Sequence, residues 1–151
     1  MGIYKRDLKI YLSGKMSGLN SDEMSEWRRI AELNLQYNAT FTNFRGALYV
    51  FNPVRYYNYE NQAHQTEREI KDFEIKHIVT SDIVIVNLDG LSTSDGSKYE
   101  IIMASQNKIP VIAFGDKKLY DELHPWIKDD ITRVEDDMDS VVTYISNFYM
   151  M

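Results

Sequence analysis

Two glutamates of the chain, Glu74 and Glu100, stand in sequence surroundings that predict opposite protonation states. Glu74 lies between Ile70 and Ile78, in the apolar stripe of a helix expected at about 66–81. A carboxylate among aliphatic side chains needs a partner or takes up a proton at a raised pKa, so Glu74 is a candidate proton donor. The simpler interpretation is a boundary residue whose carboxyl group reaches out to water.

Glu100 is expected in the first turn of a helix that starts near Ser97. Free backbone N–H groups and the helix macrodipole favour an anion there, which predicts an ionised carboxylate that is available as a nucleophile. An ordinary first-turn glutamate is the alternative. Two carboxyl groups with separated pKa values near one sheet edge are what cleavage of a glycosidic bond requires, so the pair indicates that chemistry.

The segment Ser13 to Gly18, which reads Ser-Gly-Lys-Met-Ser-Gly, joins the first predicted strand to the first predicted helix. Its backbone N–H groups, Lys15 and the serine hydroxyls could cradle a phosphate or a sugar hydroxyl. The segment matches neither a Walker A motif nor a GxGxxG fingerprint, so it does not indicate ATP or a dinucleotide. A plain strand-to-helix turn is the alternative.

Short apolar strands alternate with helical patterns along the whole chain. Strands are expected at 9–12, 47–51, 83–88, 110–114 and 132–134. Helices are expected at about 21–37, 66–81, 97–108, 119–128 and 136–149, and 38–46 is expected to be a loop. This alternation predicts an α/β fold with a parallel sheet between two layers of helices. Five strands suit a flavodoxin-like or Rossmann-like three-layer α/β/α arrangement with strand order 2-1-3-4-5.

The run Ile83 to Val86 is apolar at every position and stops at Asn87. Such a run predicts a strand that is buried on both faces of a parallel sheet. Open α/β sheets bind ligands just beyond the carboxyl ends of their strands, so the polar loop after Asn87 is expected to border the site.

Length and composition narrow the class of protein. The 151 residues, 44% of them hydrophobic, predict one domain, 1–151, with a sizeable core. A net charge of −6 argues against binding to a nucleic acid polymer. The chain has no cysteine, and its three histidines lack metal-ligand spacing, so no metal is expected. No apolar run approaches the roughly 20 residues of a membrane span, and a cytoplasmic protein without a membrane partner is expected.

Several segments, taken in order, resemble the nucleoside 2-deoxyribosyltransferase-like superfamily, which includes nucleotide N-glycosidases. These segments are IYLSGKMSG at 10–18, Trp27-Arg28, FNP at 51–53, Glu74 eight residues before Asp82, and SDGSKYEIIMA at 94–104. The opening is similar to a phage and bacterial branch with a "YISGKMTGL" type of loop.

The resemblance implies that Glu100 is the nucleophile, that Tyr11 positions it and that Glu74 is the acid. Glu74 stands where Asp is more common, and Ile102 stands where a glycine is usual. No cofactor is implied. The candidate substrate-binding residues are Ser13, Gly14, Lys15, Met16, Ser17, Gly18, Asn52, Asp89, Ser94, Gly96 and Ser97.

Ser94 stands where the N-glycosidases have serine and the transferases have aspartate, according to the resemblance. Together with Lys15 it favours a 5′-monophosphate, whereas Asp89 and Asp95 would repel one. The expected reaction is cleavage or transfer of the N-glycosidic bond of a nucleoside or deoxynucleoside, or its 5′-monophosphate, through a glycosyl-enzyme on Glu100. The expected partner is therefore a small molecule of nucleotide salvage.

Other interpretations remain open. Glu74 and Ile102 favour a catalytically weak nucleotide-binding or regulatory module on the same fold. A response-regulator receiver would need an acidic cluster after the first strand, where this chain has Ser13-Gly14-Lys15. The aromatic and methionine-rich end, 144–151, and the resemblance predict a homodimer or higher homo-oligomer with pockets completed by a neighbouring subunit. The alternative is a terminal helix packed on its own sheet.

Overall fold

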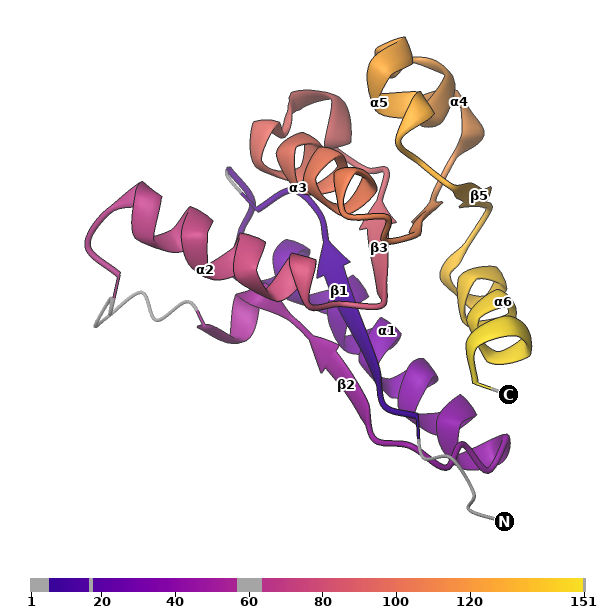
Figure 1. Cartoon of the computed structure of the whole chain (residues 1–151). Helices are drawn as coiled ribbons and strands as arrows, with labels where there is room; N and C mark the ends of the chain where they lie inside the picture. Colours follow the sequence, from indigo (N-terminus) through magenta and orange to yellow (C-terminus); the bar gives the residue numbers. More distant parts are fainter. Residues whose placement is uncertain (1–5, 17, 57–63, 151) are drawn as a thin grey trace.

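The computed structural model describes residues 6–16, 18–56 and 64–150 and contains a five-stranded parallel sheet. Its strands are β1 (Leu8–Ser13), β2 (Leu48–Phe51), β3 (Ile83–Asn87), β4 (Val111–Phe114) and β5 (Arg133–Glu135). Their order is β2-β1-β3-β4-β5, and each neighbouring pair is parallel. The predicted class, strand number and strand order are confirmed (Figure 1).

Alternating side chains of the central strand β3 enter two separate cores. Ile83 and Ile85 pack in a cluster with α1 (Ser21–Phe41) and α6 (Met138–Tyr149). Val84 and Val86 pack in a second cluster with α2 (Glu67–Val79) and α3 (Asp95–Gln106). Because all five residues of β3 are buried, the strand needs apolar side chains on both faces, which explains its unbroken apolar run. Helices therefore cover both faces of the sheet, as in a three-layer α/β/α fold (Figure 1).

Helix α1 is longer than its apolar pattern predicts. It continues to Phe41, so residues 38–41, predicted as loop, are helical. Asn38 and Thr40 each donate a side-chain hydrogen bond to the backbone carbonyl four residues earlier. These polar side chains hydrogen-bond within the helix, and Thr42 ends it as the C-cap.

The single helix predicted at 119–128 is two short helices, α4 (Lys117–Asp121) and α5 (Pro125–Asp129). Pro125 lacks a backbone N–H and stands at the first position of α5, where His124 provides the N-cap.

Two 3₁₀ turns, η1 (Pro53–Tyr56) and η2 (Leu91–Thr93), follow β2 and β3. Among the described residues, the helices all fall short of the length and apolar character that crossing a membrane requires.

Candidate active site

A cavity of about 650 Å³ opens beside the carboxyl ends of β1 and β3, which are neighbours in the sheet. The loop after β1, the helix α2 and the start of α3 form its walls. Eight of the predicted site residues line it together: Gly14, Lys15, Met16, Glu74, Ser94, Gly96, Ser97 and Glu100. The cavity lies at the sheet edge where the sequence predicts a ligand site, because the connections after β1 and β3 run to opposite faces there.

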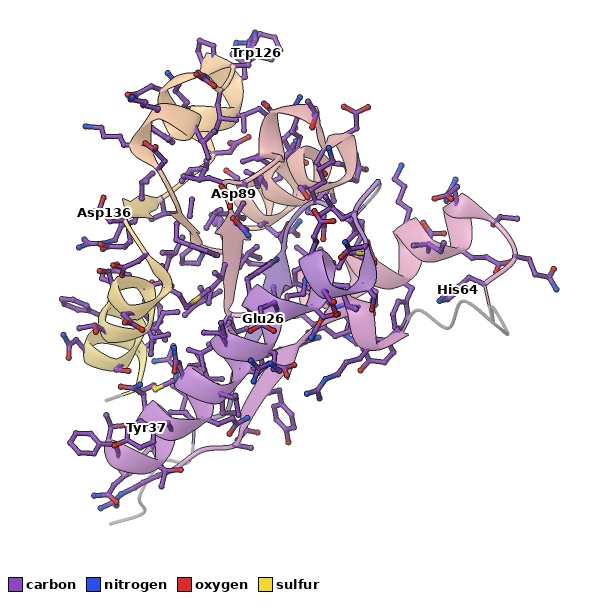
Figure 2. All side chains as sticks on the ribbon, turned by 180° about the vertical axis from the view of Figure 1, so that it is seen from behind. Glu26, Tyr37, His64, Asp89, Trp126 and Asp136 are labelled. Carbon is purple, nitrogen blue, oxygen red and sulfur yellow. The ribbon has the colours of Figure 1, made fainter. Side chains whose placement is uncertain are left out.

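Other predicted site residues lie outside the lining of this cavity. Asp89 borders a separate hollow of about 460 Å³ on the α1 side, which Lys15 also lines, and Figure 2 labels Asp89 on the face seen from behind. Asn52 is buried and accepts a hydrogen bond from the Val54 N–H, and Gly18 is exposed in the loop before α1. Ser17 lies outside the described residues.

Glu100 is buried at the base of the cavity, and the prediction of an ionised first-turn glutamate is wrong. Helix α3 begins at Asp95, two residues earlier than predicted, because Ser94 caps it by accepting a hydrogen bond from the Ser97 N–H. Glu100 is therefore in the second turn and is only 8% exposed. The pKa of Glu100 is raised to about 8. Burial is the largest cause, and the negative charge of Glu74 is the second.

Two residues of β1 lie beside the Glu100 carboxyl group and lower its pKa in part. The Ser13 hydroxyl donates a hydrogen bond of 3.4 Å to Glu100 Oε1. The fully buried Tyr11 hydroxyl also interacts with the carboxyl group, which lowers the pKa of Glu100. Among the described residues, Tyr11 Oη and Glu100 Oε2 each lack a partner with regular hydrogen-bond geometry. Their interaction is therefore longer or more bent than an ordinary hydrogen bond.

Tyr11 is held in place by aromatic packing. Its ring stacks on Phe51 of β2, with ring centroids 5.1 Å apart. Burial, followed by the charges of Glu100 and Glu74, raises the pKa of the Tyr11 hydroxyl well above its usual value of 10.0. Tyr11 is therefore a neutral hydrogen-bond donor at physiological pH, directed at a carboxyl group that is short of partners.

Glu74 is half-buried on α2, and it lines the cavity together with Ile70 and Ile75. Its charge is close enough to Glu100 to raise the pKa of that carboxyl group. Strong desolvation is found at Glu100, whose predicted place in a first helical turn is a polar environment. The site thus holds two interacting carboxyl groups, with one of them protonated in large part at neutral pH.

A cation and several hydroxyl groups also line the cavity, around the start of α3. Lys15 Nζ donates to Thr93 Oγ1 over 3.0 Å, and the aliphatic part of Lys15 packs against Gly90. Gly90 has a φ of +75°, and a Cβ atom there would lie 2.7 Å from Lys15 Cδ, so a side chain at Gly90 would displace the lysine. The Ser94 and Ser97 hydroxyls hydrogen-bond to each other at 2.9 Å.

The pair that joins α2 to α3 at the cavity was not predicted from the sequence. Lys71 Nζ lies over the Tyr99 ring, 4.5 Å from its centroid, and both residues line the cavity. Lys71 stands three residues before Glu74 and so belongs to the same helix face, a spacing that could have revealed it. Sequence spacing gives no comparable signal for Tyr99. Ile102 packs against the core and does not line the cavity.

Within the ranges described, no group of three or more histidine, cysteine, aspartate or glutamate side chains could hold a metal ion.

A sequence model of the nucleoside 2-deoxyribosyltransferase family matches residues 10–138. The chain therefore belongs to this family, whose activity is transfer or hydrolysis at N-glycosidic bonds of small nucleoside substrates. A search of curated proteins finds no significant match.

Solved structures share the fold at low sequence identity. A 2-deoxyribosyltransferase from Bacillus psychrosaccharolyticus has a TM-score of 0.64 at 20% identity, with 90% of this chain and 91% of that chain covered. A conserved protein from Enterococcus faecalis V583 has a TM-score of 0.65 at 16% identity, with 94% and 99% covered. The CMP N-glycosidase BcmB from Clostridium botulinum has a TM-score of 0.54 at 14% identity, with 93% and 98% covered.

Proposed function

We propose that the protein cleaves or transfers the N-glycosidic bond of a nucleoside or deoxynucleoside, or of its 5′-monophosphate, through a glycosyl-enzyme on Glu100. One observation carries this proposal: Glu100 and Glu74 line the same cavity and are electrostatically coupled. A retaining glycosidase needs one carboxylate to attack and one carboxylic acid to protonate the leaving group.

In the first step, a Glu100 oxygen bonds to C1′ while the bond from C1′ to the base nitrogen breaks. The electron pair of that bond goes to the base, which takes up a proton from Glu74. In the second step, water or another base attacks C1′ and releases the Glu100 carboxylate, while Glu74 receives the proton of the incoming group. Glu100 Oε2 suits the attack because it has no regular hydrogen-bond partner among the described residues.

The positive charge that develops on the sugar favours the ionised form of Glu100. Burial disfavours the carboxylate and raises the pKa of Glu100 to about 8 in the protein without substrate. An oxocarbenium-like transition state beside the carboxylate adds positive charge there and so favours its ionised form. The single proton then belongs on Glu74, where the departing base can take it.

A 5′-monophosphate fits the end of the cavity formed by Lys15, Ser94 and Ser97. Lys15 Nζ already donates to a neutral hydroxyl, Thr93 Oγ1, and a phosphate oxygen is the stronger acceptor. The Ser94 and Ser97 hydroxyls and the start of α3 add donors to the same wall.

The test is incubation with a panel of nucleosides and their 5′-monophosphates, followed by measurement of free base. A 2-fluoro-2-deoxy sugar substrate, whose glycosyl-enzyme breaks down slowly, is expected to label Glu100. Glu100→Ala should lose three or more orders of magnitude in turnover, about 4 kcal/mol of barrier. Base release by Glu100→Ala at a rate close to wild type would exclude the proposed nucleophile.

A catalytically weak nucleotide-binding or regulatory module on the same fold is the second candidate. The raised pKa of Glu100 favours it, because a pKa of about 8 leaves this carboxyl group mostly protonated at neutral pH. Such a module would bind nucleotides by calorimetry, yet release no base across pH 6 to 9.

Self-association is also proposed, as a homodimer or higher homo-oligomer. The exposed side chains Leu33, Tyr37 and Phe41 follow one another at helical spacing along α1, and Phe148 of the adjacent α6 is exposed as well. Figure 2 labels Tyr37 on this face of α1. Contiguous apolar side chains on a surface favour an interface. A monomeric mass by light scattering at micromolar concentration would exclude it.

A further inference from the structure

Arg28 of α1 is buried completely, although arginine is one of the residue types least often found inside a protein. Its guanidinium group reaches beneath the loop that follows β1. Nη2 donates to the Gly14 carbonyl at 3.0 Å, and Nη1 donates to the Met24 carbonyl at 2.6 Å. The guanidinium carbon lies 4.5 Å from the centroid of the Trp27 ring.

The loop packs tightly on this pair of side chains. A Cβ atom at Gly14 would lie 2.7 Å from Trp27 Cζ2 and 3.4 Å from Arg28 Nη2, so the backbone reaches its position because residue 14 is a glycine. Gly14 lies between Ser13, which hydrogen-bonds Glu100, and Lys15, which lines the cavity. Arg28 therefore fixes the backbone between two groups of the site.

The charge of Arg28 also reaches the carboxyl group in the site. It lowers the pKa of Glu100 and of Tyr11, and so it acts against the burial that raises both. The other groups that face Glu100 are Tyr11 and Ser13 from β1 and Glu74 from α2. The same cavity is lined by the charged side chains Lys15, Lys71, Glu67 and Asp95. Among the side chains that lower the pKa of Glu100, Arg28 is the one with a full positive charge.

We propose that Arg28 is a positioning residue that holds the loop after β1 by its Gly14 carbonyl and provides the buried positive charge against which the Glu100 carboxylate forms. Burial of a cation costs free energy, and here the buried charge lies close enough to Glu100 to stabilise its carboxylate form. The inference rests on the proposed role of Glu100 as nucleophile. The electrostatic part can be measured without any substrate.

The test compares two neutral variants, Arg28→Met and Arg28→Gln, with Arg28→Lys, which keeps the charge. Gln retains an N–H donor for the Gly14 carbonyl, so it separates the charge from the hydrogen bond. Arg29→Met is the matched control, because Arg29 is the next residue of α1 but is exposed and paired with Glu26. The first measurement is a ¹³C NMR titration of Glu100, identified by the signal that is missing in Glu100→Gln. The second is the pH dependence of kcat/KM for base release from an activated substrate, whose base departs without the proton of Glu74.

Both neutral variants should move the Glu100 titration to higher pH by about one pH unit or more, the scale of a nearby opposite charge. At pH 7 their kcat/KM should fall about tenfold and recover as the pH is raised, because a tenfold smaller fraction of Glu100 is ionised. Arg28→Lys and Arg29→Met should titrate as the wild type does.

An unchanged Glu100 titration in folded neutral variants, with activity lost equally at every pH, would reduce Arg28 to a structural role and overturn the proposal. If the neutral variants do not fold and Arg28→Lys does, the charge of Arg28 is needed for folding. That result would also overturn the proposal. A shifted titration in a protein that releases no base would instead support the electrostatic role of Arg28 and overturn the proposed function.

Discussion

Ser13 Oγ donates to Glu100 Oε1 at 3.4 Å, inside the protein, and so connects the last residue of β1 to the second turn of α3. The contact holds one carboxyl oxygen and leaves Glu100 Oε2 without a regular partner among the described residues. An asymmetric arrangement of this kind suits a nucleophile, because the unpartnered oxygen can form a bond while the other stays fixed. It also makes the charge on Glu100 sensitive to a single hydroxyl group.

Removal of that hydroxyl in Ser13→Ala is expected to raise the pKa of Glu100 further, because the hydrogen bond from Ser13 lowers it. The loss of one buried hydrogen bond, about 1 kcal/mol, should reduce kcat/KM about fivefold at pH 7. Ser146→Ala is the matched control, since Ser146 is a buried serine of α6 that packs away from the site. Equal losses in the two variants would show that Ser13 acts on stability and not on Glu100.

For an activated substrate, whose base departs without the proton of Glu74, the pH profile of the wild type should have its acidic limb at about pH 8, where Glu100 of the free protein titrates. Below that value most molecules carry a protonated nucleophile, so kcat/KM should rise about tenfold per pH unit up to the limb and then level off. Initial rates at subsaturating substrate from pH 5.5 to 9.5 measure this. A flat profile between pH 6 and 9 would contradict the requirement for an ionised Glu100.

Stability should change with pH in the opposite direction. The folded pKa of Glu100 is raised to about 8 from an ordinary value of 4.5, so between these values the folded protein holds a proton that the unfolded chain has lost. The free energy of unfolding should therefore fall as pH rises through this window, by up to about 1.4 kcal/mol per pH unit from this group. Urea unfolding at several pH values measures the slope.

Glu100→Gln should flatten this dependence, since the amide stays neutral, and it should be more stable than the wild type at pH 9. The exposed Glu122→Gln is the control and should keep the wild-type slope. If Glu100→Gln retained that slope, another group would be responsible for it.

Lys15→Ala should weaken the use of a 5′-monophosphate by about 1.5–3 kcal/mol, the scale of a charge-assisted hydrogen bond. The unphosphorylated nucleoside should be used nearly as well as by the wild type, because the lysine is expected to bind the phosphate and not the sugar. Comparison of kcat/KM for the two substrates measures the difference, with the exposed Lys117→Ala as control. Equal losses on both substrates would indicate that Lys15 supports the loop through its contacts with Gly90 and Thr93.

The strands could be predicted from the sequence because burial on two faces leaves an unmistakable pattern. Their order could be predicted from the fold class that five alternating strands suit. Ile83 to Val86 must be apolar at each position when helices pack on both sides. The start of α3 could not be placed in the same way. It depends on the Ser94 side chain capping the helix, and Ser94, Ser97 and the intervening residues are all compatible with a cap or a loop.

The electrostatics of the site were misjudged for the same reason. A shift of two residues in the helix start moves Glu100 from a polar first turn to the face that packs on the sheet. Periodicity places Glu74 among aliphatic side chains but does not show that a cavity opens beside it. Arg28 has no sequence signal for its burial, because its neighbours in the helix do not reveal that a loop from β1 lies over it.

Glu74→Gln is expected to distinguish the role of Glu74 as the acid from the role of Glu100 as the nucleophile. Glutamine cannot give a proton to the departing base, so the release of poor leaving bases should slow far more than the release of activated ones, which depart without protonation. The same change removes the negative charge that raises the pKa of Glu100, so the Glu100 titration should move to lower pH. The acidic limb of kcat/KM for an activated substrate should follow it. Uniform slowing across leaving groups, with the limb still at about pH 8, would show that Glu74 neither protonates the base nor acts on Glu100.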